Sequence, residues 1–184
     1  MSAAPSAQPQ PQPMPRIGSG IDVHAFGAPS PDATVVLAGV LIPSDAPLEG
    51  HSDADVVAHA VIDALLGAAG LGDIGTRFGV DDPAMGGADS MLMLLDVVAE
   101  LRAAGWRPGN IDVTVVAARP RIAPHRDTMR ERLAVTLGLA PDAVSVKATT
   151  TDGLGSIGRA EGIAAWAVAL VVADDRPGSV VAAE

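Results

Sequence analysis

Three side chains that can bind a divalent cation stand out in two segments of the sequence. Asp22 and His24 lie two residues apart in RIGSGIDVHAF (16–26), whose apolar pattern predicts a β-strand. Residues i and i+2 of a strand point to the same side, so this pair would present two ligands together. With His59, one carboxylate and two imidazoles form the donor set of a catalytic zinc that keeps an open fourth position. A polar pair at a strand end is the alternative interpretation.

His59 belongs to the segment around which the chain is organised, residues 49–75 (EGHSDADVVAHAVIDALLGAAGLGDIG). Its apolar side chains recur at the three- and four-residue spacing of a buried helical stripe. Ser52 or Asp53 is expected to cap the start of this helix, and glycines end it. Polar residues at four-residue steps are expected to share a second face: Asp55, His59 and Asp63. Burying such a row costs free energy unless its members are paired or bind metal, and an exposed polar face is the alternative.

Two further segments have the composition of anion-binding sites. Residues 147–162 (KATTTDGLGSIGRAEG) offer hydroxyls, glycine N–H groups and Arg159 to phosphate oxygens, and Asp152 could hold Mg²⁺ beside them. Residues 119–126 (RPRIAPHR) place Arg121 after an apolar strand, where it could grip a phosphate or shape a base pocket. A Thr- and Gly-rich surface loop and a solvated basic rim are the alternatives.

Strands and helices are expected to alternate along the chain. Apolar patterns predict strands over 16–26, 110–118, 143–149 and 162–173, a hairpin over 34–43, and helices over 90–104 and roughly 125–137. Residues 72–75 are expected to form a tight turn, and residues 76–88 and 150–161 glycine-rich loops. This order predicts an α+β fold, a mixed β-sheet with helices packed on one face.

Composition limits the class of protein further. The 184 residues are expected to form one domain over 16–173, between a disordered Pro/Gln-rich tail (1–15) and a loose C-terminal tail (174–184). A net charge of -10 argues against a nucleic-acid partner, and the absence of cysteine excludes thiolate metal sites. No apolar run reaches the roughly 18 residues of a membrane span, and no secretory or transit signal is recognisable, so a cytoplasmic location is expected.

In this order the segments resemble the 2-C-methyl-D-erythritol 2,4-cyclodiphosphate synthase family of the non-mevalonate isoprenoid pathway. The resemblance runs from about residue 16 to 173 and rests on RIGSGIDVHAF, LEGHSDADVVAHAVIDALLGAAGLGDIG, GADS, NIDVTVVAARPRIAPH, VKATTTDGLG and GRAEGIA. It implies a homotrimer whose sheets face the trimer axis, with active sites between adjacent subunits. It also implies an intramolecular reaction, in which the 2-phosphate of the substrate attacks the β-phosphorus of its CDP group and expels CMP.

The resemblance implies roles for individual residues as well. Zn²⁺ would be bound by Asp22, His24 and His59, with a substrate phosphate as fourth ligand. Mg²⁺ or Mn²⁺ would accompany the substrate diphosphate, and the expected catalytic residues are His51, Thr150 and Asp152. The methylerythritol phosphate side of the substrate would contact His51 and Ser52, and Asp73 and Gly75 would hold its methylerythritol part. The cytidine and diphosphate pocket, contributed by the neighbouring subunit, would consist of Ala117, Arg121, Ile122, Ala123, Ala148, Thr149 and Thr150.

Several positions depart from the family pattern. Asp152 stands where a glutamate commonly binds Mg²⁺, and Arg121 replaces a common lysine. Some relatives bind an isoprenoid diphosphate at the trimer axis through an arginine that corresponds to Arg159, but Ser156 here replaces an aromatic residue of that site. These departures leave open a catalytically silent trimer that binds cytidine nucleotides or isoprenoid diphosphates. A zinc phosphohydrolase is a third interpretation, and it predicts linear products instead of a ring.

Overall fold

The computed structural model describes residues 13–79 and 86–174. Nearly all of the two predicted tails, and part of the loop predicted over 76–88, lie outside these ranges. In chain order the elements are β1 (Arg16–Ala25), β2 (Thr34–Leu37), β3 (Val40–Pro43), α1 (Val56–Ala69), α2 (Ile74–Phe78), α3 (Ser90–Ala103), β4 (Trp106–Val116), η2 (Ala123–His125), α4 (Arg126–Leu137), η3 (Pro141–Ala143), β5 (Val144–Thr149), α5 (Gly155–Gly158) and β6 (Gly162–Ala173).

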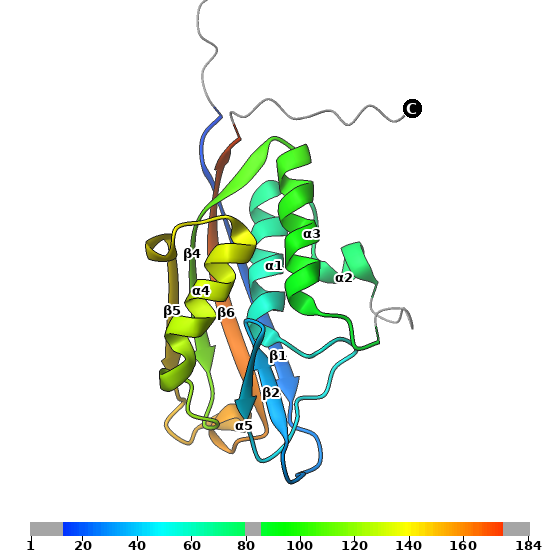
Figure 1. Cartoon of the computed structure of the whole chain (residues 1–184), viewed down its shortest axis with the longest axis vertical. Helices are drawn as coiled ribbons and strands as arrows, with labels where there is room; N and C mark the ends of the chain where they lie inside the picture. The colour runs from blue at the N-terminus through cyan, green and yellow to red at the C-terminus, as the bar shows by residue number, and fades with distance from the viewer. Residues whose placement is uncertain (1–12, 80–85, 175–184) are drawn as a thin grey trace, which may run out of the picture.

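One mixed sheet with helices on one face forms the body of the protein, as the sequence predicted (Figure 1). Its strand order is β1-β6-β4-β5, and a separate hairpin joins β2 and β3. β6 runs antiparallel to both neighbours, whereas β4 and β5 are parallel. β1, β4 and β5 therefore run in one direction, and their carboxyl ends meet at the same end of the sheet.

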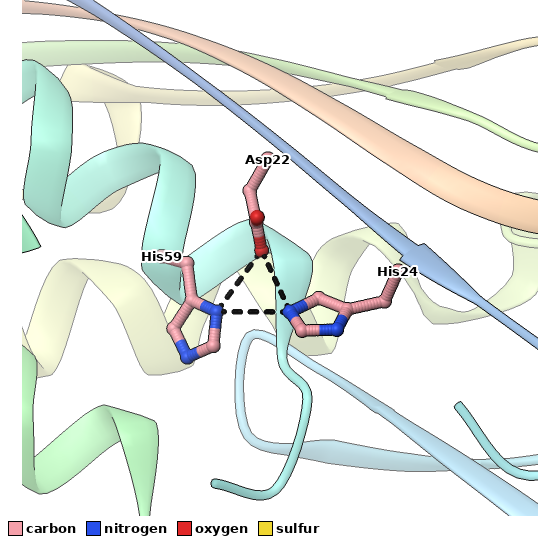
Figure 2. A group of neighbouring side chains, drawn as sticks. All are labelled: Asp22, His24 and His59. Carbon is pink, nitrogen blue, oxygen red and sulfur yellow. Dashed lines mark hydrogen bonds and ion pairs between the residues drawn. The ribbon is translucent and has the colours of Figure 1, made fainter. Parts of the chain in front are cut away.

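β1 and α1 approach each other closely because two glycines of β1 face the helix. A Cβ atom added at Gly18 would lie 2.1 Å from the carbonyl oxygen of Ala64, and one at Gly20 would lie 2.1 Å from that of Ala60. Alternation along the strand turns Asp22 and His24 to the same side as these glycines. The strand and the helix thereby bring Asp22, His24 and His59 together (Figure 2).

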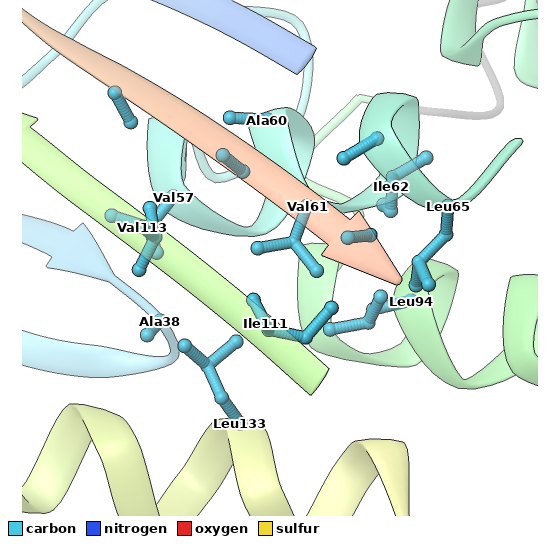
Figure 3. Close-up of a cluster of buried hydrophobic side chains, with 14 of the residues drawn as sticks. Ala38, Val57, Ala60, Val61, Ile62, Leu65, Leu94, Ile111, Val113 and Leu133 are labelled. Carbon is cyan, nitrogen blue, oxygen red and sulfur yellow. The ribbon is translucent and has the colours of Figure 1, made fainter. Parts of the chain in front are cut away.

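The core fills the space between the sheet and its helices. Small residues on the helix-facing side of β6 leave room for α1, and larger ones from α3 and α4 close the layer (Figure 3). Fully buried side chains at its centre include Val61, Leu65, Leu94, Ile111, Val113, Leu133, Ala165 and Ala167. This packing fixes α1, and with it His59, relative to the sheet.

The opposite face of the sheet is apolar and open. Ile17 and Ile21 of β1 are 72% and 53% exposed, and Trp166 of β6 is 55% exposed. Val23 and Val168 continue this open face. No helix of the described residues covers it (Figure 1). Contiguous apolar patches of this kind mark association surfaces.

The start of α1 differs from the prediction. Neither Ser52 nor Asp53 caps the helix. The cap is Asp55, whose carboxylate accepts hydrogen bonds from the backbone N–H groups of Val57 and Ala58, both at 3.0 Å. The Asp55 carboxylate also accepts from the backbone N–H groups of Ala38 and Gly39 and is completely buried, so Asp55 is not part of an exposed polar face.

Three other boundaries also differ. Residues 72–75 were expected to form a turn, but Asp73 caps the short helix α2 there. β4 begins at Trp106, before the predicted start at 110, because the strand continues through an irregularity between Pro108 and Asn110. The loop predicted over 150–161 contains the helical turn α5.

Candidate metal centre and active site

Asp22, His24 and His59 converge as the sequence predicted (Figure 2). Asp22 Oδ2 lies 3.1 Å from His24 Nε2 and 3.0 Å from His59 Nδ1. The two imidazole nitrogens are 3.3 Å apart. The strand supplies two donors and the helix supplies the third.

This metal triad fits a small divalent cation. Donor atoms about 2.0–2.2 Å from a tetrahedral zinc ion lie roughly 3.3–3.6 Å apart. The three observed separations, 3.0 to 3.3 Å, need only a slight widening to match one face of such a tetrahedron. One carboxylate oxygen and two imidazole nitrogens are also a suitable donor set for zinc.

The charges within the metal triad are strongly coupled. Partial burial by itself would raise the pKa of Asp22, but hydrogen bonds with His24 and His59 outweigh burial and lower the pKa well below its ordinary value. The hydrogen bond to Asp22 raises the pKa of His24 despite partial burial. The carboxylate thus attracts positive charge to this point, as either protons or a metal cation.

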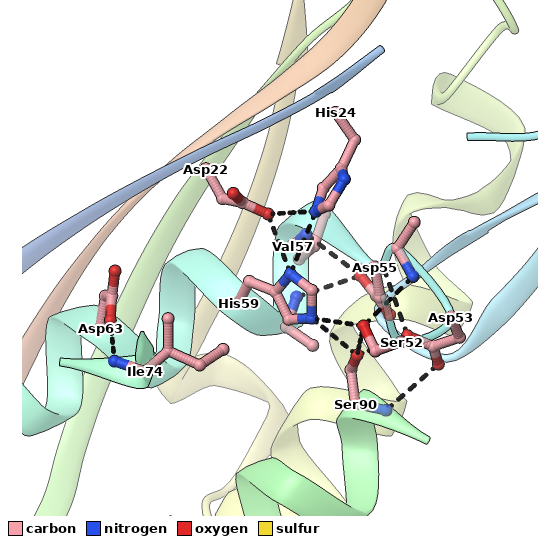
Figure 4. A network of polar contacts seen from close by, with 12 residues as sticks. Asp22, His24, Ser52, Asp53, Asp55, Val57, His59, Asp63, Ile74 and Ser90 are labelled. Atoms are coloured by element: carbon pink, nitrogen blue, oxygen red, sulfur yellow. Dashed lines mark hydrogen bonds and ion pairs between the residues drawn. The ribbon is translucent and has the colours of Figure 1, made fainter. Parts of the chain in front are cut away.

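Neighbouring groups orient both imidazoles. His24 Nδ1 is 2.5 Å from the carbonyl oxygen of Glu49. A carbonyl only accepts, so Nδ1 carries a hydrogen, and in the neutral form of the ring Nε2 holds the lone pair that a cation at the metal triad needs. His59 Nε2 lies 3.0 Å from Ser52 Oγ and 2.9 Å from Ser90 Oγ, on the side away from Asp22 (Figure 4).

A cavity of about 170 Å³, here called the triad cavity, opens beside the two histidines. Of the residues expected to contact the methylerythritol phosphate side, the structure places His51, Ser52 and Gly75 in its lining. Asp73 does not line the triad cavity. Its carboxylate accepts a hydrogen bond from Thr76 N at 2.7 Å, a contact that lowers the pKa of Asp73.

A second cavity of about 180 Å³, here called the loop hollow, lies where β4 and β5 end. It brings together every residue expected in the cytidine and diphosphate pocket, and its lining is Ala117, Ala118, Pro120, Arg121, Ile122, Ala123, Ala148, Thr149 and Thr150. Arg119 connects this loop to two other segments. It forms an ion pair with Asp45, which follows β3, and its guanidinium lies 5.2 Å from the ring centre of Phe26, which follows β1.

The remaining predicted residues lie around these cavities. Asp152 is exposed and accepts a hydrogen bond from Thr150 Oγ1 at 3.1 Å, next to the loop hollow. Arg159 lines neither cavity. Its Nε donates to Glu161 at 2.6 Å, and this contact lowers the pKa of Glu161.

Sequence reasoning named Asp55 and Asp63 but missed their supporting roles. Asp55 accepts from Ala38 N at 2.8 Å and Gly39 N at 2.7 Å as well as from its own helix, and burial raises its pKa to about 6. Asp63 accepts from Ile74 N at 2.8 Å and so connects α1 to α2, with its pKa raised by burial. The run of acidic and hydroxyl residues at 52–55 indicated a cap but not which residue forms it.

Comparisons with known proteins agree with this architecture. The model of the YgbB family matches residues 15–172. A relative from Symbiobacterium thermophilum, named 2-C-methyl-D-erythritol 2,4-cyclodiphosphate synthase, is 57% identical over 155 residues, which cover 84% of this chain and 97% of that protein. A relative of the same name from Bordetella petrii is 54% identical over 156 residues, 85% of this chain and 94% of that protein.

Solved structures show the same fold. The bifunctional IspDF from Campylobacter jejuni matches with a TM-score of 0.83 and 40% identity over 88% of this chain. The match covers 43% of IspDF, so this chain spans less than half of that protein. The Plasmodium falciparum IspF in complex with CDP matches with a TM-score of 0.76 and 30% identity, over 88% of this chain and 97% of that one.

Fold and site together define an α+β protein with a candidate metal centre of two histidines and a carboxylate beside an open cavity. With the matches above, the chain belongs to the YgbB family. It is an enzyme of the phosphorus–oxygen lyase type, like the cyclodiphosphate synthases it resembles. Within the described residues, no helix is both long and apolar enough to cross a membrane.

Proposed function

We propose that this enzyme converts 4-diphosphocytidyl-2-C-methyl-D-erythritol 2-phosphate into 2-C-methyl-D-erythritol 2,4-cyclodiphosphate and CMP. The observation that carries the proposal is the metal triad beside an open cavity, in a chain 57% identical to a protein named for this product. The CDP of the related Plasmodium falciparum complex supports a cytidine nucleotide as part of the ligand.

The reaction is a displacement within one molecule. An oxygen of the 2-phosphate forms a bond to the β-phosphorus, and the bond from that phosphorus to the bridging oxygen breaks, so CMP leaves with the bridging oxygen. Both reacting groups are anionic, and the enzyme must bend the substrate and offset the repulsion between its phosphates. No protein nucleophile is required.

Each cavity has a role in this scheme. Asp22, His24 and His59 would hold Zn²⁺, which neutralises phosphate charge and polarises a phosphorus–oxygen bond when bound. His51 and Ser52 line the triad cavity and would orient the 2-phosphate, with Asp73 and Gly75 near the methylerythritol carbons. We assign catalytic contacts to His51, Thr150 and Asp152, the last as the carboxylate for Mg²⁺ or Mn²⁺.

The loop hollow would hold the cytidine and the diphosphate. Its shallow apolar floor suits a base, and Arg121, Thr149 and Thr150 at its rim suit phosphate oxygens. Asp152 follows Thr150 by two residues in a left-handed conformation with φ of 51°, and its carboxylate is exposed at the hollow's edge.

We further propose a homotrimer in which the triad cavity of one subunit faces the loop hollow of the next. The open apolar face formed by β1 and β6 supports burial of the sheets around a common axis. An isoprenoid diphosphate at that axis would have to compete with Glu161 for Arg159. We place the single catalytic domain at residues 16–173, and the reaction in the cytoplasm.

Phosphorus NMR tests the proposed reaction. The purified protein is incubated with the CDP-linked methylerythritol 2-phosphate, Zn²⁺ and Mg²⁺. The expected products are CMP and a cyclic diphosphate in equal amounts. Saturable binding without CMP would indicate a catalytically silent nucleotide-binding protein. Linear phosphates that take up ¹⁸O from labelled water would indicate a phosphohydrolase.

A further inference from the structure

The hydroxyl group of Ser90 lies between His59 and the carboxylate of Asp53 (Figure 4). Ser90 Oγ is 2.9 Å from His59 Nε2 and donates a short hydrogen bond to Asp53 Oδ1. The backbone N–H of Ser90 donates to the other Asp53 oxygen at 3.1 Å. Ser90 is completely buried at the start of α3, so this arrangement is held by the helix.

The direction of these hydrogen bonds follows from the number of protons available. An ionised carboxylate only accepts, and a hydroxyl has a single proton to donate. Ser52 Oγ, at 3.4 Å, is a more distant and uncharged alternative acceptor, so the Ser90 proton goes to Asp53. Ser90 Oγ therefore presents only lone pairs to His59 Nε2, and Nε2 must carry a hydrogen.

A hydrogen on Nε2 of His59 determines whether Nδ1, the other ring nitrogen, has a free lone pair. A neutral imidazole carries one N–H, so Nδ1 of His59 keeps its lone pair. Nδ1 is the nitrogen that lies 3.0 Å from Asp22 Oδ2 and 3.3 Å from His24 Nε2. Lone pairs from all three groups then face one point, and such an arrangement requires a positive charge there.

Ser52 does not impose the same direction. Its hydroxyl is 3.0 Å from the same nitrogen, but it lines the open triad cavity. Within the described residues, its other hydrogen bonds are with the backbone N–H of Ala54 at 3.3 Å and with Ser90 itself. No carboxylate within the described ranges accepts a hydrogen bond from Ser52, so its hydroxyl can either donate or accept.

We propose that Asp53 and Ser90 are positioning residues that hold His59 with Nε2 protonated and direct its Nδ1 lone pair to the divalent cation. The proposal rests on the metal site of the proposed function. Metal-binding histidines generally donate their other ring N–H to a nearby acceptor, and loss of that acceptor typically weakens metal affinity about 10- to 100-fold. Ser90 fills this role because its own O–H is already donated in the hydrogen bond to Asp53.

Zinc affinity tests the proposal without reference to turnover. Zinc dissociation constants of the purified protein and its variants are measured by competition with a chromophoric chelator. Ser90→Ala removes the acceptor, and we expect zinc binding to weaken by about 10- to 100-fold. Ser52→Ala is the matched control, since it removes the other hydroxyl near the same nitrogen, and we expect a change below about threefold.

Asp53→Asn keeps the shape of the side chain but changes the pattern of hydrogen bonds. An amide offers one acceptor where the carboxylate offered two. If the amide nitrogen faces Ser90 Oγ, Ser90 is free to donate to His59 Nε2 and favours the wrong ring form. If it faces the Ser90 backbone N–H, two donors oppose each other. Either way, zinc affinity is expected to fall, while Ser52→Ala still binds like the unmodified protein.

NMR of the zinc-loaded protein labelled with ¹⁵N-histidine gives a readout that a purely structural role would not move. We expect a slowly exchanging Nε2–H resonance of His59, retained in Ser52→Ala and lost to exchange in Ser90→Ala. If urea titration shows that Ser90→Ala is not folded, the proposal is tested by Asp53→Asn and by this resonance in the unmodified protein.

Three results would overturn the inference. One is zinc affinity unchanged in both Ser90→Ala and Asp53→Asn, and another is Ser52→Ala weakening zinc as much as Ser90→Ala. The third is a fast-exchanging His59 Nε2–H in the unmodified protein. In these cases the unmodified protein still binds zinc, so the proposed function stands. If the unmodified protein binds no zinc, the metal assignment and this inference fall together.

Discussion

The triad cavity and the loop hollow have nearly the same volume, about 170 and 180 Å³, but they are held in different ways. The three side chains of the candidate metal triad come from a strand and a helix that touch through Gly18 and Gly20, and hydrogen bonds orient them. The loop hollow is lined mainly by residues that follow β4 and β5, and Arg121, Thr149 and Thr150 are exposed.

This difference indicates what each cavity can do alone. The metal triad is preorganised by the core, so it can bind a cation with little rearrangement. The exposed side chains of the loop hollow keep their freedom until a ligand or a neighbouring subunit restricts them, and they therefore contribute affinity at an entropic cost. We expect substitutions at the triad to change metal binding strongly, and substitutions at the hollow to change nucleotide binding more weakly.

The largest effect is expected for His59→Ala. Loss of one of three protein ligands should weaken zinc binding by more than about 100-fold and abolish CMP release. Zinc content after dialysis, measured by mass spectrometry, and CMP release are the two readouts. His125→Ala, outside both cavities, is the control and should keep zinc. A zinc-free His59→Ala protein that still releases CMP would contradict the assignment.

Gly20→Ala should disturb the close contact of β1 and α1 without changing any side chain of the metal triad. A Cβ at this position would lie 2.1 Å from the carbonyl oxygen of Ala60, one residue from His59, so α1 must move away from β1. Overpacking of this kind costs about 1–3 kcal/mol of unfolding free energy and should weaken zinc binding about tenfold.

Gly67→Ala is the matched control on the same helix. A Cβ at Gly67 meets nothing within 4 Å, and alanine favours the helical conformation. We expect this variant to gain about 0.5–1 kcal/mol and to bind zinc normally. Urea unfolding and chelator competition measure both quantities. Equal zinc affinity in Gly20→Ala and Gly67→Ala would show that the close approach of β1 and α1 does not position the ligands.

Arg121→Ala tests the contribution of the exposed side chains of the loop hollow to nucleotide binding. Losing a charge-assisted contact to phosphate should raise the dissociation constant for CDP about 10-fold and leave zinc affinity and unfolding free energy unchanged. Calorimetric titration with CDP provides the measurement, and Arg107→Gln, an exposed substitution on β4, is the control. Unchanged CDP binding in Arg121→Ala would show that Arg121 does not contact the diphosphate.

A pH dependence centred on His24 is also expected. Its pKa is raised above 6.5 by Asp22, so the stability of the metal-free protein from this pair is complete below pH 6.5 and is lost as the pH rises through the raised pKa. Zinc requires the neutral imidazole, so zinc affinity changes in the opposite sense and improves up to tenfold per pH unit over this range. Zinc affinity that is independent of pH between about 6 and 9 would contradict this.

The sequence predicted the convergence of Asp22, His24 and His59 because their positions follow from local geometry. Asp22 and His24 point the same way on any strand, and His59 lies on a strongly patterned helix. The hydrogen bonds that orient the ligands could not be predicted, since Asp53 and Ser90 are 37 residues apart and meet only through the packing of α3 on α1. Local patterns also placed the helix cap wrongly. Asp55, and not Ser52 or Asp53, is the cap because its carboxylate also accepts hydrogen bonds from N–H groups of the β2–β3 turn, which is remote in sequence.

Mixing two inactive variants tests most directly the claim that a rigid metal half and an exposed nucleotide half come from neighbouring subunits. His59→Ala and a hollow variant, Thr150→Ala combined with Arg121→Ala, are unfolded together and refolded as mixed assemblies. In a closed ring, random mixing at equal amounts restores about one site in four, so about a quarter of the unmodified CMP release is expected. Mixed assemblies no more active than either variant alone would contradict the account, because both halves would then have to come from the same chain.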